Sequence, residues 1–469
     1  MVFSSTVFLF AFLPLLFLFY FMAAEKWRNY VLLIFSLVFY AWGEPKFLPV
    51  MIILVMLDYI FAICIGRTEK IQRKKIYVAA TVVSNLGLLG YYKYTKFVLE
   101  NVNVFLQKNI TIPDIVLPIG ISFFTFQAMS YVLDVYRGDA KVQKNPFYVL
   151  LYVSLFPQLV AGPIVRYQTV EEEIVSRKTT AADFSEGLER FIIGFGKKII
   201  ISNNAAVVVD NIFGASKIDA SMAWLAVIGY GLQIYFDFSA YSDMAIGLGR
   251  ILGFHFKENF DFPYISQSAT EFWRRWHISL SSWFRDYVYI PLGGNRKGVK
   301  RQIFNMFVVW ALTGIWHGAA WTYIVWGLYF FVLLVLEKYV LHSFLEKLPR
   351  IVRHLYFFFC INISWALFRG EDLSQAWWVV KHMLRMHVTT DGWAMTNMYL
   401  HQYGLYLVLG VIFCAPVYRI LKEKMSKVKA EKTRILLQGI NYAGLLVLFF
   451  VSILYLVNSS YNPFIYFRF

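Results

Sequence analysis

SATEFWRRWHISLSSWFRDYVYIPLGGNRKG (residues 268–298) and TGIWHGAA (residues 313–320) each place one histidine, His277 and His317, among tryptophans. His317 also lies within residues 303–336, a run that contains no Asp, Glu, Lys or Arg. About 20 apolar residues are enough to span a bilayer, so this run predicts membrane-spanning helices. A titratable side chain at that depth is costly, which makes His317 the first candidate for a functional residue.

The composition of the whole chain indicates a helical membrane protein. Of 469 residues, 59% are hydrophobic and only 16% are charged, and the mean hydropathy is +0.54. Soluble chains carry about 25% charged residues. Only helices and closed barrels satisfy their backbone in lipid, and the apolar runs here are long and continuous, unlike the short alternating strands of a barrel. We therefore predict an all-α polytopic membrane protein in contact with membrane lipids.

The net charge of +16 does not indicate nucleic-acid binding. The basic residues lie in short loops between apolar runs, which is the pattern of cytoplasmic loops in membrane proteins. The loops 67–75 and 419–434 are the richest in Lys and Arg and are predicted to be cytoplasmic. Three scattered cysteines, Cys64, Cys360 and Cys414, form no CxxC pair. We expect them to be small buried apolar residues rather than zinc ligands or disulfides.

The two basic loops orient both ends of the chain. The apolar run 2–24 has no positively charged segment before it and exceeds a signal-peptide core, so it predicts a retained transmembrane helix. Three helices precede the loop 67–75 and one follows the loop 419–434, so the N-terminus and the tail 458–469 are predicted to lie outside. A single domain over residues 1–469 is expected. The predicted apolar helices comprise residues 2–24, 30–42, 47–65, 76–98, 115–136, 147–165, 184–213, 220–236, 351–368, 403–421 and 435–457.

Two further helices carry unusual polar features. Lys197 and Lys198 fall in the middle of 184–213 and indicate a break or a deep polar face. Residues 268–290 are predicted to form one amphipathic interfacial helix that begins at a Ser268–Glu271 capping box. Its apolar stripe consists of Trp273, Trp276, Leu280, Phe284 and Tyr287.

Residues 237–254 are rich in glycine and apolar, yet they carry Asp237 and Asp243. Irregular backbone at membrane depth is tolerated only where it is buried in protein or lines a wet cavity. We therefore predict a re-entrant segment here. The two aspartates are expected to pair with Lys or Arg, and a structural ion pair is the favoured interpretation.

The neighbours of His317 allow two interpretations. Trp316 would form an apolar wall and Gly318 would leave an open approach. An imidazole in an apolar pocket stays neutral and remains a base near neutral pH, which suits removal of a proton from a hydroxyl group that attacks a thioester. The alternative is a structural histidine bonded to a neighbouring helix, with Gly314 and Gly318 as a small-xxx-small packing site.

His277 stands next to Arg274 and Arg275. It could be a solvated side chain on an interfacial helix, or a second polar group on the path to His317. The chain has no HExxH motif, which disfavours a two-histidine metal site, and no metal is expected.

The chain's last eight residues, NPFIYFRF at 462–469, contain four aromatic side chains. One interpretation is an aromatic anchor at the membrane interface. The other is that Tyr466, whose phenol can act as a nucleophile, takes part in acyl transfer.

Several of these segments resemble one family. WRRWHISLSSWFRDYVYIPLGGNRKG (273–298) and GIWHGAAWTYIVWG (314–327) strongly resemble the membrane-bound O-acyltransferase superfamily, and within it the bacterial alginate O-acetyltransferase branch. Residues 1–10, 117–138, 156–166 and 236–249 are similar to the same branch, so the resemblance covers nearly the whole chain.

The resemblance implies a funnel-shaped bundle of about 10 to 12 membrane segments with re-entrant and interfacial helices. His317 matches the family's catalytic histidine, and His277 matches its second motif histidine. Residues expected to line the site are Trp316, Gly318, Arg274, Arg275, Asp237 and Asp243.

The reaction implied is transfer of an acyl group, usually acetyl, from a cytoplasmic thioester donor such as acetyl-CoA across a bacterial cytoplasmic membrane. No bound cofactor is implied. A separate extracytoplasmic transferase, of SGNH type or similar, would then esterify polysaccharide hydroxyls. In the related teichoic-acid system a partner's aromatic tail, similar to FIYFRF, carries a tyrosine, which implies that Tyr466 is an acyl relay.

Three alternatives are distinguishable by experiment. A D-alanyl transferase on the same fold would attach a group of different mass. A transporter of a lipid-linked or anionic sugar, which also uses broken helices and midplane polar groups, would need no acyl donor. A structural scaffold would leave His317 without a role. The polymer itself is left open among alginate, peptidoglycan, cellulose and secondary wall polymers.

Overall fold

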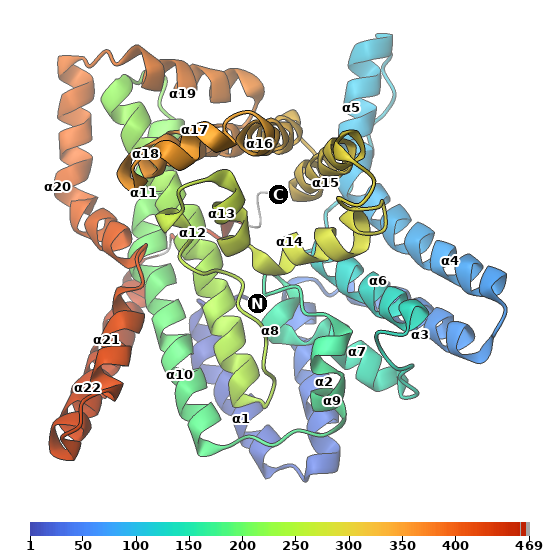
Figure 1. Ribbon diagram of the computed structural model, residues 1–469. Helices are drawn as coiled ribbons and strands as arrows, with labels where there is room; N and C mark the ends of the chain where they lie inside the picture. The colour runs from blue at the N-terminus through green and yellow to red at the C-terminus, as the bar shows by residue number, and fades with distance from the viewer. Residues whose placement is uncertain (460, 466–469) are drawn as a thin grey trace. The chain divides into compact units, whose positions relative to one another are not determined.

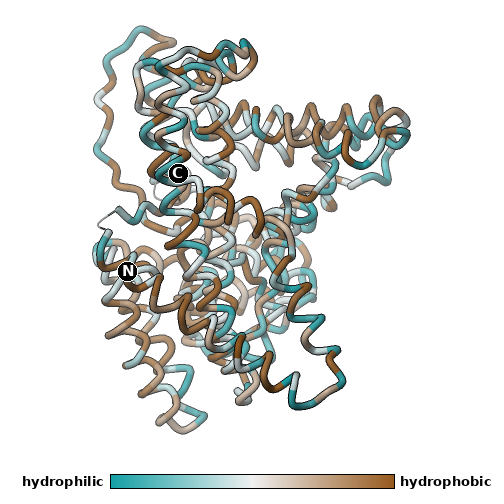
Figure 2. Tube along the Cα trace, turned by 90° about the vertical axis from the view of Figure 1, so that its left-hand side faces the viewer, coloured by the Kyte–Doolittle hydropathy of each residue, from teal (hydrophilic) through white to brown (hydrophobic). Residues whose placement is uncertain are grey.

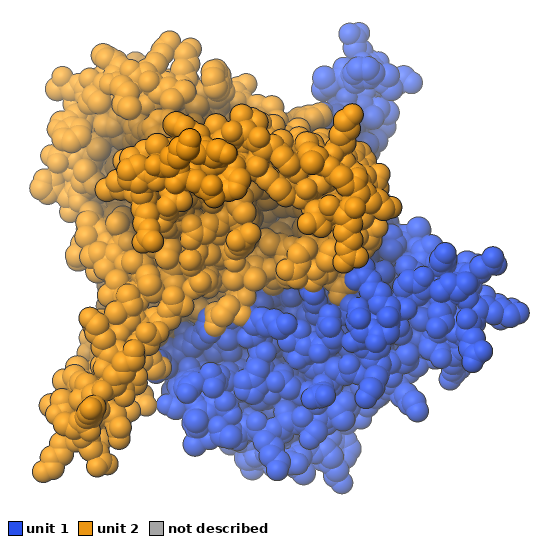
Figure 3. All heavy atoms as spheres, in the orientation of Figure 1, with its two compact units in different colours: residues 1–191, 244–257 blue, residues 192–243, 258–469 orange. Residues whose placement is uncertain are grey.

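The computed structural model describes residues 1–459 and 461–465, and within them the secondary structure is helical with no β-strand (Figure 1). The chain divides into two compact units, coloured separately in Figure 3. Unit 1 comprises Met1–Phe191 and Met244–Lys257, and unit 2 comprises Ile192–Asp243 and Glu258–Phe469. The predicted all-α polytopic membrane fold is confirmed.

Five described helical segments are long and apolar enough to cross a membrane, and a sixth results if one bent pair is counted as a single span (Figure 2). The other predicted segments are shorter or more polar, so the number ten to twelve stays a prediction. The five segments are Leu48–Arg67, Ala181–Phe213, Trp321–Tyr339, Arg350–Arg369 and Glu431–Asn458, and the bent pair is Thr390–Phe413 with Val417–Ser426.

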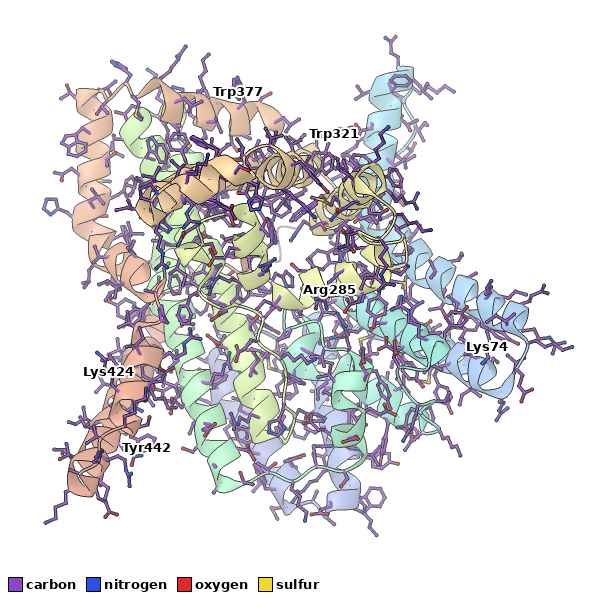
Figure 4. The ribbon with its side chains drawn as sticks, in the orientation of Figure 1. Lys74, Arg285, Trp321, Trp377, Lys424 and Tyr442 are labelled. Carbon is purple, nitrogen blue, oxygen red and sulfur yellow. The ribbon has the colours of Figure 1, made fainter. Side chains whose placement is uncertain are left out.

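Large aromatic side chains are exposed on several of these helices. Trp321 and Tyr442 are more than half exposed on two of the spanning segments, and so is Trp377 on the shorter helix α19 (Leu373–Arg385) (Figure 4). In the span 431–458, only 11% of the most apolar window is buried inside the protein. An apolar surface of this kind is suited to lipid.

Unit 1 is built around an aromatic cluster. Phe8, Phe12, Phe39 and Phe156 bring their rings together at centroid distances between 5.3 and 6.2 Å. Its helices are η1 (Phe8–Phe12), α1 (Leu13–Met22), α2 (Glu25–Gly43), α3 (Leu48–Arg67), α4 (Ile71–Leu89), η2 (Gly90–Tyr94), α5 (Thr95–Leu106), α6 (Ile121–Arg137), α7 (Pro146–Ser154), α8 (Phe156–Leu159), α9 (Tyr167–Val175) and most of α10 (Ala181–Gly196).

Unit 2 holds both histidine motifs. Its core is a cluster of buried tryptophan and phenylalanine side chains that includes Trp273, Trp326 and Trp365. Its helices are η3 (Lys197–Ser202), α11 (Asn203–Phe213), most of α12 (Ala220–Ile251), η4 (Pro263–Ile265), α13 (Ala269–Arg275), α14 (Ile278–Phe284), η5 (Arg285–Tyr289), α15 (Val299–His317), α16 (Trp321–Tyr339), α17 (His342–Lys347), α18 (Arg350–Arg369), α19 (Leu373–Arg385), α20 (Thr390–Phe413), α21 (Val417–Ser426) and α22 (Glu431–Asn458).

The re-entrant segment predicted at 237–254 is wrong, because α12 continues as one helix through Ile251. Its glycines permit close packing rather than chain reversal. A Cβ on Gly247 would lie 2.5 Å from the carbonyl oxygen of Gly187, so the two chains approach backbone to backbone. A helix satisfies its own backbone in lipid, and a reversal at this point would not.

The single interfacial helix predicted at 268–290 is also wrong. The chain breaks at His277, whose φ of 43° is left-handed, and separates α13 from α14. Asn259 takes over hydrogen bonds at the break, because its carbonyl oxygen accepts from the Ile278 N–H at 2.9 Å. The predicted cap is present, since the Ser268 hydroxyl accepts from the Glu271 N–H at 3.1 Å. Of the predicted stripe, Trp273 and Trp276 belong to the core of unit 2, Leu280 and Phe284 are also buried, and Tyr287 is partly exposed.

At Lys197 and Lys198, where the sequence predicts a break or a deep polar face, the segment Ala181–Phe213 stays helical and the Lys198 side chain is buried. These residues begin η3, a wider π-helical turn between α10 and α11. Such turns occur often at functional sites.

Candidate active site

His317 is the last residue of α15 and is 7% exposed. The position of this helix end depends on how α15 crosses α16. At the crossing a Cβ on Gly314 would lie 3.3 Å from the Cα of Gly327, so only glycine allows this approach. The small-residue packing considered for Gly314 is therefore present, and it places His317 at a rigid helix–helix contact.

Three aromatic side chains surround the His317 imidazole: Trp316, Trp326 and Phe368. We call them the aromatic cage. Their ring centroids lie 5.0, 5.0 and 5.2 Å from that of His317, at interplanar angles of 78°, 85° and 80°. These edge-to-face contacts restrict the orientation of the His317 ring. The cage favours the neutral imidazole, because burial among apolar groups penalises charge.

The open approach expected at Gly318 is not found. A Cβ at Gly318 would run into the ring of Tyr323, so this glycine makes room for the tyrosine. The Tyr323 ring in turn packs 5.0 Å from that of Phe368, a member of the aromatic cage. Gly318 therefore acts through packing rather than by opening the site.

A small cavity adjoins His317. The volume that the centre of a water molecule can occupy in it is about 10 Å³. This is close to the space that one water molecule requires. Trp365 lines both this cavity and a second, larger one of about 160 Å³. The first cavity is lined by Ile234, Phe238, Trp276, His317, Trp326, Trp365, Phe368 and Ile465.

His277 is buried and held in one tautomer by Asn259. The Asn259 amide nitrogen donates to Ser242 Oγ at 3.0 Å, and its Oδ1 accepts from Ser279 Oγ at 2.8 Å. His277 Nδ1, 3.2 Å from that same oxygen, must therefore carry the proton and donate. The lone pair then lies on Nε2, which has no hydrogen-bond partner within the part of the chain that the structure describes.

The two histidines belong to one site. The Trp316 ring lies between the two imidazoles, 5.9 Å from His277 and 5.0 Å from His317 by ring centroids. The Phe238 ring contacts His277 at 4.6 Å and lines the cavity of His317. The buried environment of His277 is unlike that of a solvated interfacial side chain.

The arginines beside His277 face other partners. Arg274 is exposed. Arg275 forms ion pairs with Asp261 at 3.0 Å and with Glu271 at 3.1 Å, and these fasten α13 to the preceding loop. Neither residue lines the cavity of His317.

Asp237 and Asp243 each form an ion pair with a lysine of η3. Lys198 Nζ lies 2.6 Å from Asp237 Oδ1, and Lys197 Nζ lies 2.6 Å from Asp243 Oδ2. The two aspartates are six residues apart on α12, about 9 Å along the helix, so they form two successive links to η3. The ion pairing expected for both is present.

The C-terminal tail enters the same region. Ile465 is 3% exposed, and it lines the cavity that contains His317. The Phe464 ring packs 5.3 Å from that of Tyr241 on α12. Tyr466 follows directly in the chain and lies outside the described residues.

Sequence reasoning missed several members of the site. Asn259 gave no signal, because a single Asn between charged and aromatic residues is typical of a loop. Trp326 and Phe368 lie in apolar runs where any side chain could face lipid. The doublet of Lys197 and Lys198 was a usable signal, since adjacent lysines in an apolar helix require buried partners. Among the described residues, no three His, Cys, Asp or Glu side chains come together as metal ligands.

A helical membrane protein with two buried histidines in one aromatic site is characteristic of a membrane acyltransferase. The model of the membrane-bound O-acyltransferase family matches residues 140–370. The chain belongs to this family, and within it to the branch that resembles alginate O-acetylases. It is a multi-pass membrane-bound acyltransferase.

The relatives match different shares of the chain. The chain is 38% identical to the probable alginate O-acetylase AlgI of Azotobacter vinelandii over 100% of both chains. It is 35% identical to the peptidoglycan O-acetyltransferase of Helicobacter pylori over 82% of this chain and 80% of the relative. It is 32% identical to the teichoic acid D-alanyltransferase of Bacillus subtilis over 49% of this chain and 60% of the relative.

Proposed function

We propose that this protein transfers an acetyl group from a cytoplasmic thioester donor, such as acetyl-CoA, across the membrane for O-acetylation of an extracellular or envelope polysaccharide. The observation that carries the proposal is the cavity shared by His317 and Ile465. Tyr466, the candidate acyl carrier, is the next residue in the sequence after Ile465, which lines the cavity of the candidate base His317. The names of full-length relatives support acetyl as the group and polysaccharide as the acceptor.

His317 would act as the base in the first transfer. Its neutral imidazole removes the proton from the Tyr466 phenol while the phenol oxygen attacks the thioester carbonyl carbon. The C–S bond then breaks, and the departing thiolate takes the proton back from the imidazolium. The products are an acetyl ester on Tyr466 and the free thiol. The aromatic cage supports this role, because it favours the neutral imidazole, which is the form that accepts a proton.

His277 would assist at the same site. With its proton held on Nδ1 by Asn259, it offers a lone pair at Nε2. A buried nitrogen of this kind can accept a hydrogen bond from the donor or from the attacking hydroxyl. Trp316 would keep the two imidazoles at a constant separation, and the ion pairs of Asp237 and Asp243 would hold α12 beside them.

The second transfer requires a partner outside the membrane. We propose an extracytoplasmic transferase, of SGNH type or similar, that receives the acetyl group and esterifies polymer hydroxyls. This assigns the chain to the bacterial cytoplasmic membrane with both termini outside. The basic loops 67–75 and 419–434 support that orientation, because Lys and Arg accumulate on the cytoplasmic side.

The test is polymer acetylation in cells that express either the wild-type chain or His317→Ala at equal membrane levels. Loss of ester-linked acetate with the variant is expected, and Trp321→Ala serves as the matched exposed control. Acetylation retained by a well-expressed His317→Ala protein would overturn the proposal.

D-alanyl transfer is the second candidate, and the similarity to the teichoic acid D-alanyltransferase of Bacillus subtilis favours it over others. The same two-step chemistry would apply with an alanyl thioester as donor. The mass of the group released from the polymer by mild base distinguishes the two, since acetate and alanine differ in mass and charge.

A further inference from the structure

Side chains of η3 and α12 form hydrogen bonds with the main chain of the C-terminal tail at its last described residues. The Ile465 N–H donates to Asp237 Oδ2 at 2.8 Å, and the Pro463 carbonyl oxygen accepts from Lys198 Nζ. These two groups lie on either side of Phe464. Because main-chain atoms are held, the grip is largely independent of which side chains the tail carries.

The gripping residues are a buried ion pair. The Lys198 and Asp237 side chains are 3% and 1% exposed, and Nζ lies 2.6 Å from Oδ1. A buried ion pair alone is weak evidence of stabilisation, since removing two charges from water is costly. The cost falls when further hydrogen bonds reach the two charges, and here the tail supplies one to each of them. In return the pair provides a partner for two main-chain groups of the tail, of which the Ile465 N–H is buried.

Further polar contacts follow the tail toward α22. Asn203 Nδ2 donates to Asn462 Oδ1 at 3.2 Å, and the Tyr461 hydroxyl donates to Asp210. Asp210 also pairs with Arg369 of α18 at 2.7 Å. The tail is thus held at successive residues by η3, α11 and α12.

The register of the tail is restricted as well. Pro463 has no N–H, so a two-residue slip that placed it opposite Asp237 would leave that carboxylate without its donor. A buried acceptor left unpaired is unfavourable. The contact of Phe464 with Tyr241 adds a side-chain constraint at the residue between the two grips.

We propose that Lys198 and Asp237 form a main-chain clamp that sets the register of the C-terminal tail and holds Ile465 in the cavity of His317. They are positioning residues, since they touch the tail's backbone rather than a reacting atom. The inference rests on the proposed function, because the register matters only if the tail carries the acyl group. It assigns the buried charge of α12 and η3 to tail placement rather than to substrate binding.

The clamp is tested by the accessibility of a cysteine placed at position 464. Phe464 is buried, so Phe464→Cys reports release of the tail when a water-soluble maleimide is added to the purified full-length protein. Cys64, Cys360 and Cys414 are replaced by alanine in this background, since all three are free thiols.

Two double variants, each of which removes the charges of both Lys198 and Asp237, are compared with each other. Lys198→Met with Asp237→Leu removes the ion pair and both grips, whereas Lys198→Met with Asp237→Asn removes the pair and keeps an acceptor for the Ile465 N–H. We expect the maleimide to label the cysteine at position 464 about tenfold or more faster in the first double variant than in the protein with the unmodified clamp. The reason is that a hydrogen bond to a charged group changes the equilibrium between bound and released tail by roughly a factor of ten or more. The second should fall between it and the unmodified clamp. Lys197→Met, whose lysine pairs with the more exposed Asp243, is the matched control.

Substitutions at Ile465 test the clamp from the side of the tail and leave the Lys198–Asp237 ion pair unchanged. Ile465→Pro removes the N–H that donates to Asp237, and Ile465→Ala keeps it. Faster labelling with proline than with alanine supports the clamp even if the double variants fail to fold. Equal labelling rates in this pair overturn it.

Maleimide labelling at position 464 tests the clamp, and acetylation of Tyr466 tests the acyl relay, so the two hypotheses can fail independently. If release of the tail occurs as expected but Tyr466 is never acetylated in the wild-type protein, the clamp stands and the relay fails. If Tyr466 is acetylated in the wild-type protein and labelling is unchanged by these substitutions, the relay stands and the clamp is wrong.

Discussion

Gly314 of α15 and Gly327 of α16 meet backbone to backbone, three residues before His317. A Cβ on Gly314 would lie 2.5 Å from the Tyr323 carbonyl oxygen, which cannot move without shifting α16. Gly314→Ala should therefore lower the free energy of unfolding by about 1–3 kcal/mol through overpacking. Thermal melting of the detergent-solubilised protein measures this.

Gly444 of α22 is the matched control for that substitution, because a Cβ there would have no neighbour within 4 Å. Gly444→Ala should leave stability unchanged or raise it by at most about 1 kcal/mol, since alanine favours the helix. Equal destabilisation by the two substitutions would contradict the tight crossing of α15 and α16.

Asn259 sets the tautomer of His277, so its removal should reduce transfer without removing the histidine. Asn259→Ala removes the oxygen that accepts from the buried His277 Nδ1–H and from the Ser279 hydroxyl, at roughly 1–3 kcal/mol for each lost hydrogen bond. We expect the rate of acyl transfer to fall by about 10- to 100-fold. Ser242→Ala removes only the group that orients the Asn259 amide and should have the smaller effect. If both variants transfer at the wild-type rate, His277 does not depend on this network.

Gly318 and Tyr323 should show coupled effects. Gly318→Ala pushes against the Tyr323 ring, and that ring supports Phe368 in the aromatic cage. We expect the single variant to reduce transfer and Gly318→Ala with Tyr323→Leu to recover part of it. A double-mutant cycle measures the coupling, which should reach about 0.5–3 kcal/mol for residues in contact. Strict additivity would show that the two residues do not touch.

Asp219, which precedes α12, should contribute a pH-dependent part of the stability. Burial disfavours its charge, but hydrogen bonds from the Met222 N–H, the Ser221 hydroxyl and Thr389 prevail and hold the pKa of Asp219 below its ordinary value of 3.8. A carboxyl with a lowered pKa stabilises the folded state above its unfolded pKa, and this contribution is lost as the pH falls through the folded pKa. The stability difference between wild type and Asp219→Asn should therefore be constant near neutral pH and shrink below about pH 4. A difference that does not change down to pH 3 would show that the carboxylate is not stabilised by folding.

The spanning helices could be predicted from the sequence because an apolar run and its charged ends are local features. The helix predicted at 47–65 is found at Leu48–Arg67, and the one predicted at 435–457 is found within Glu431–Asn458. The polar position at Lys197 was also visible, since charge in an apolar helix needs a partner. Predictions of this kind depend on residues that are neighbours in the chain.

The errors concern contacts between distant residues. The glycines of 237–254 indicated a reversal, but Gly247 serves the close approach of Gly187, which lies 60 residues earlier in the chain. The break at His277 is stabilised by Asn259, 18 residues away, and no periodicity reveals that partner. The cavity of His317 gathers side chains from α12, α15, α16 and α18 together with Trp276, which follows α13, and the tail, so its composition follows only from the fold.

Acyl transfer to the tail can be measured as the mass of the C-terminal peptide after the purified protein is incubated with isotope-labelled acetyl-CoA. We expect one labelled acetyl group on Tyr466 in the wild-type protein and none in His317→Ala. Tyr466→Phe, which keeps the ring and removes the hydroxyl, should also carry no label. A labelled tail in His317→Ala would show that this histidine is not the base. Donor cleavage with an unlabelled tail in the wild-type protein would remove Tyr466 from the reaction.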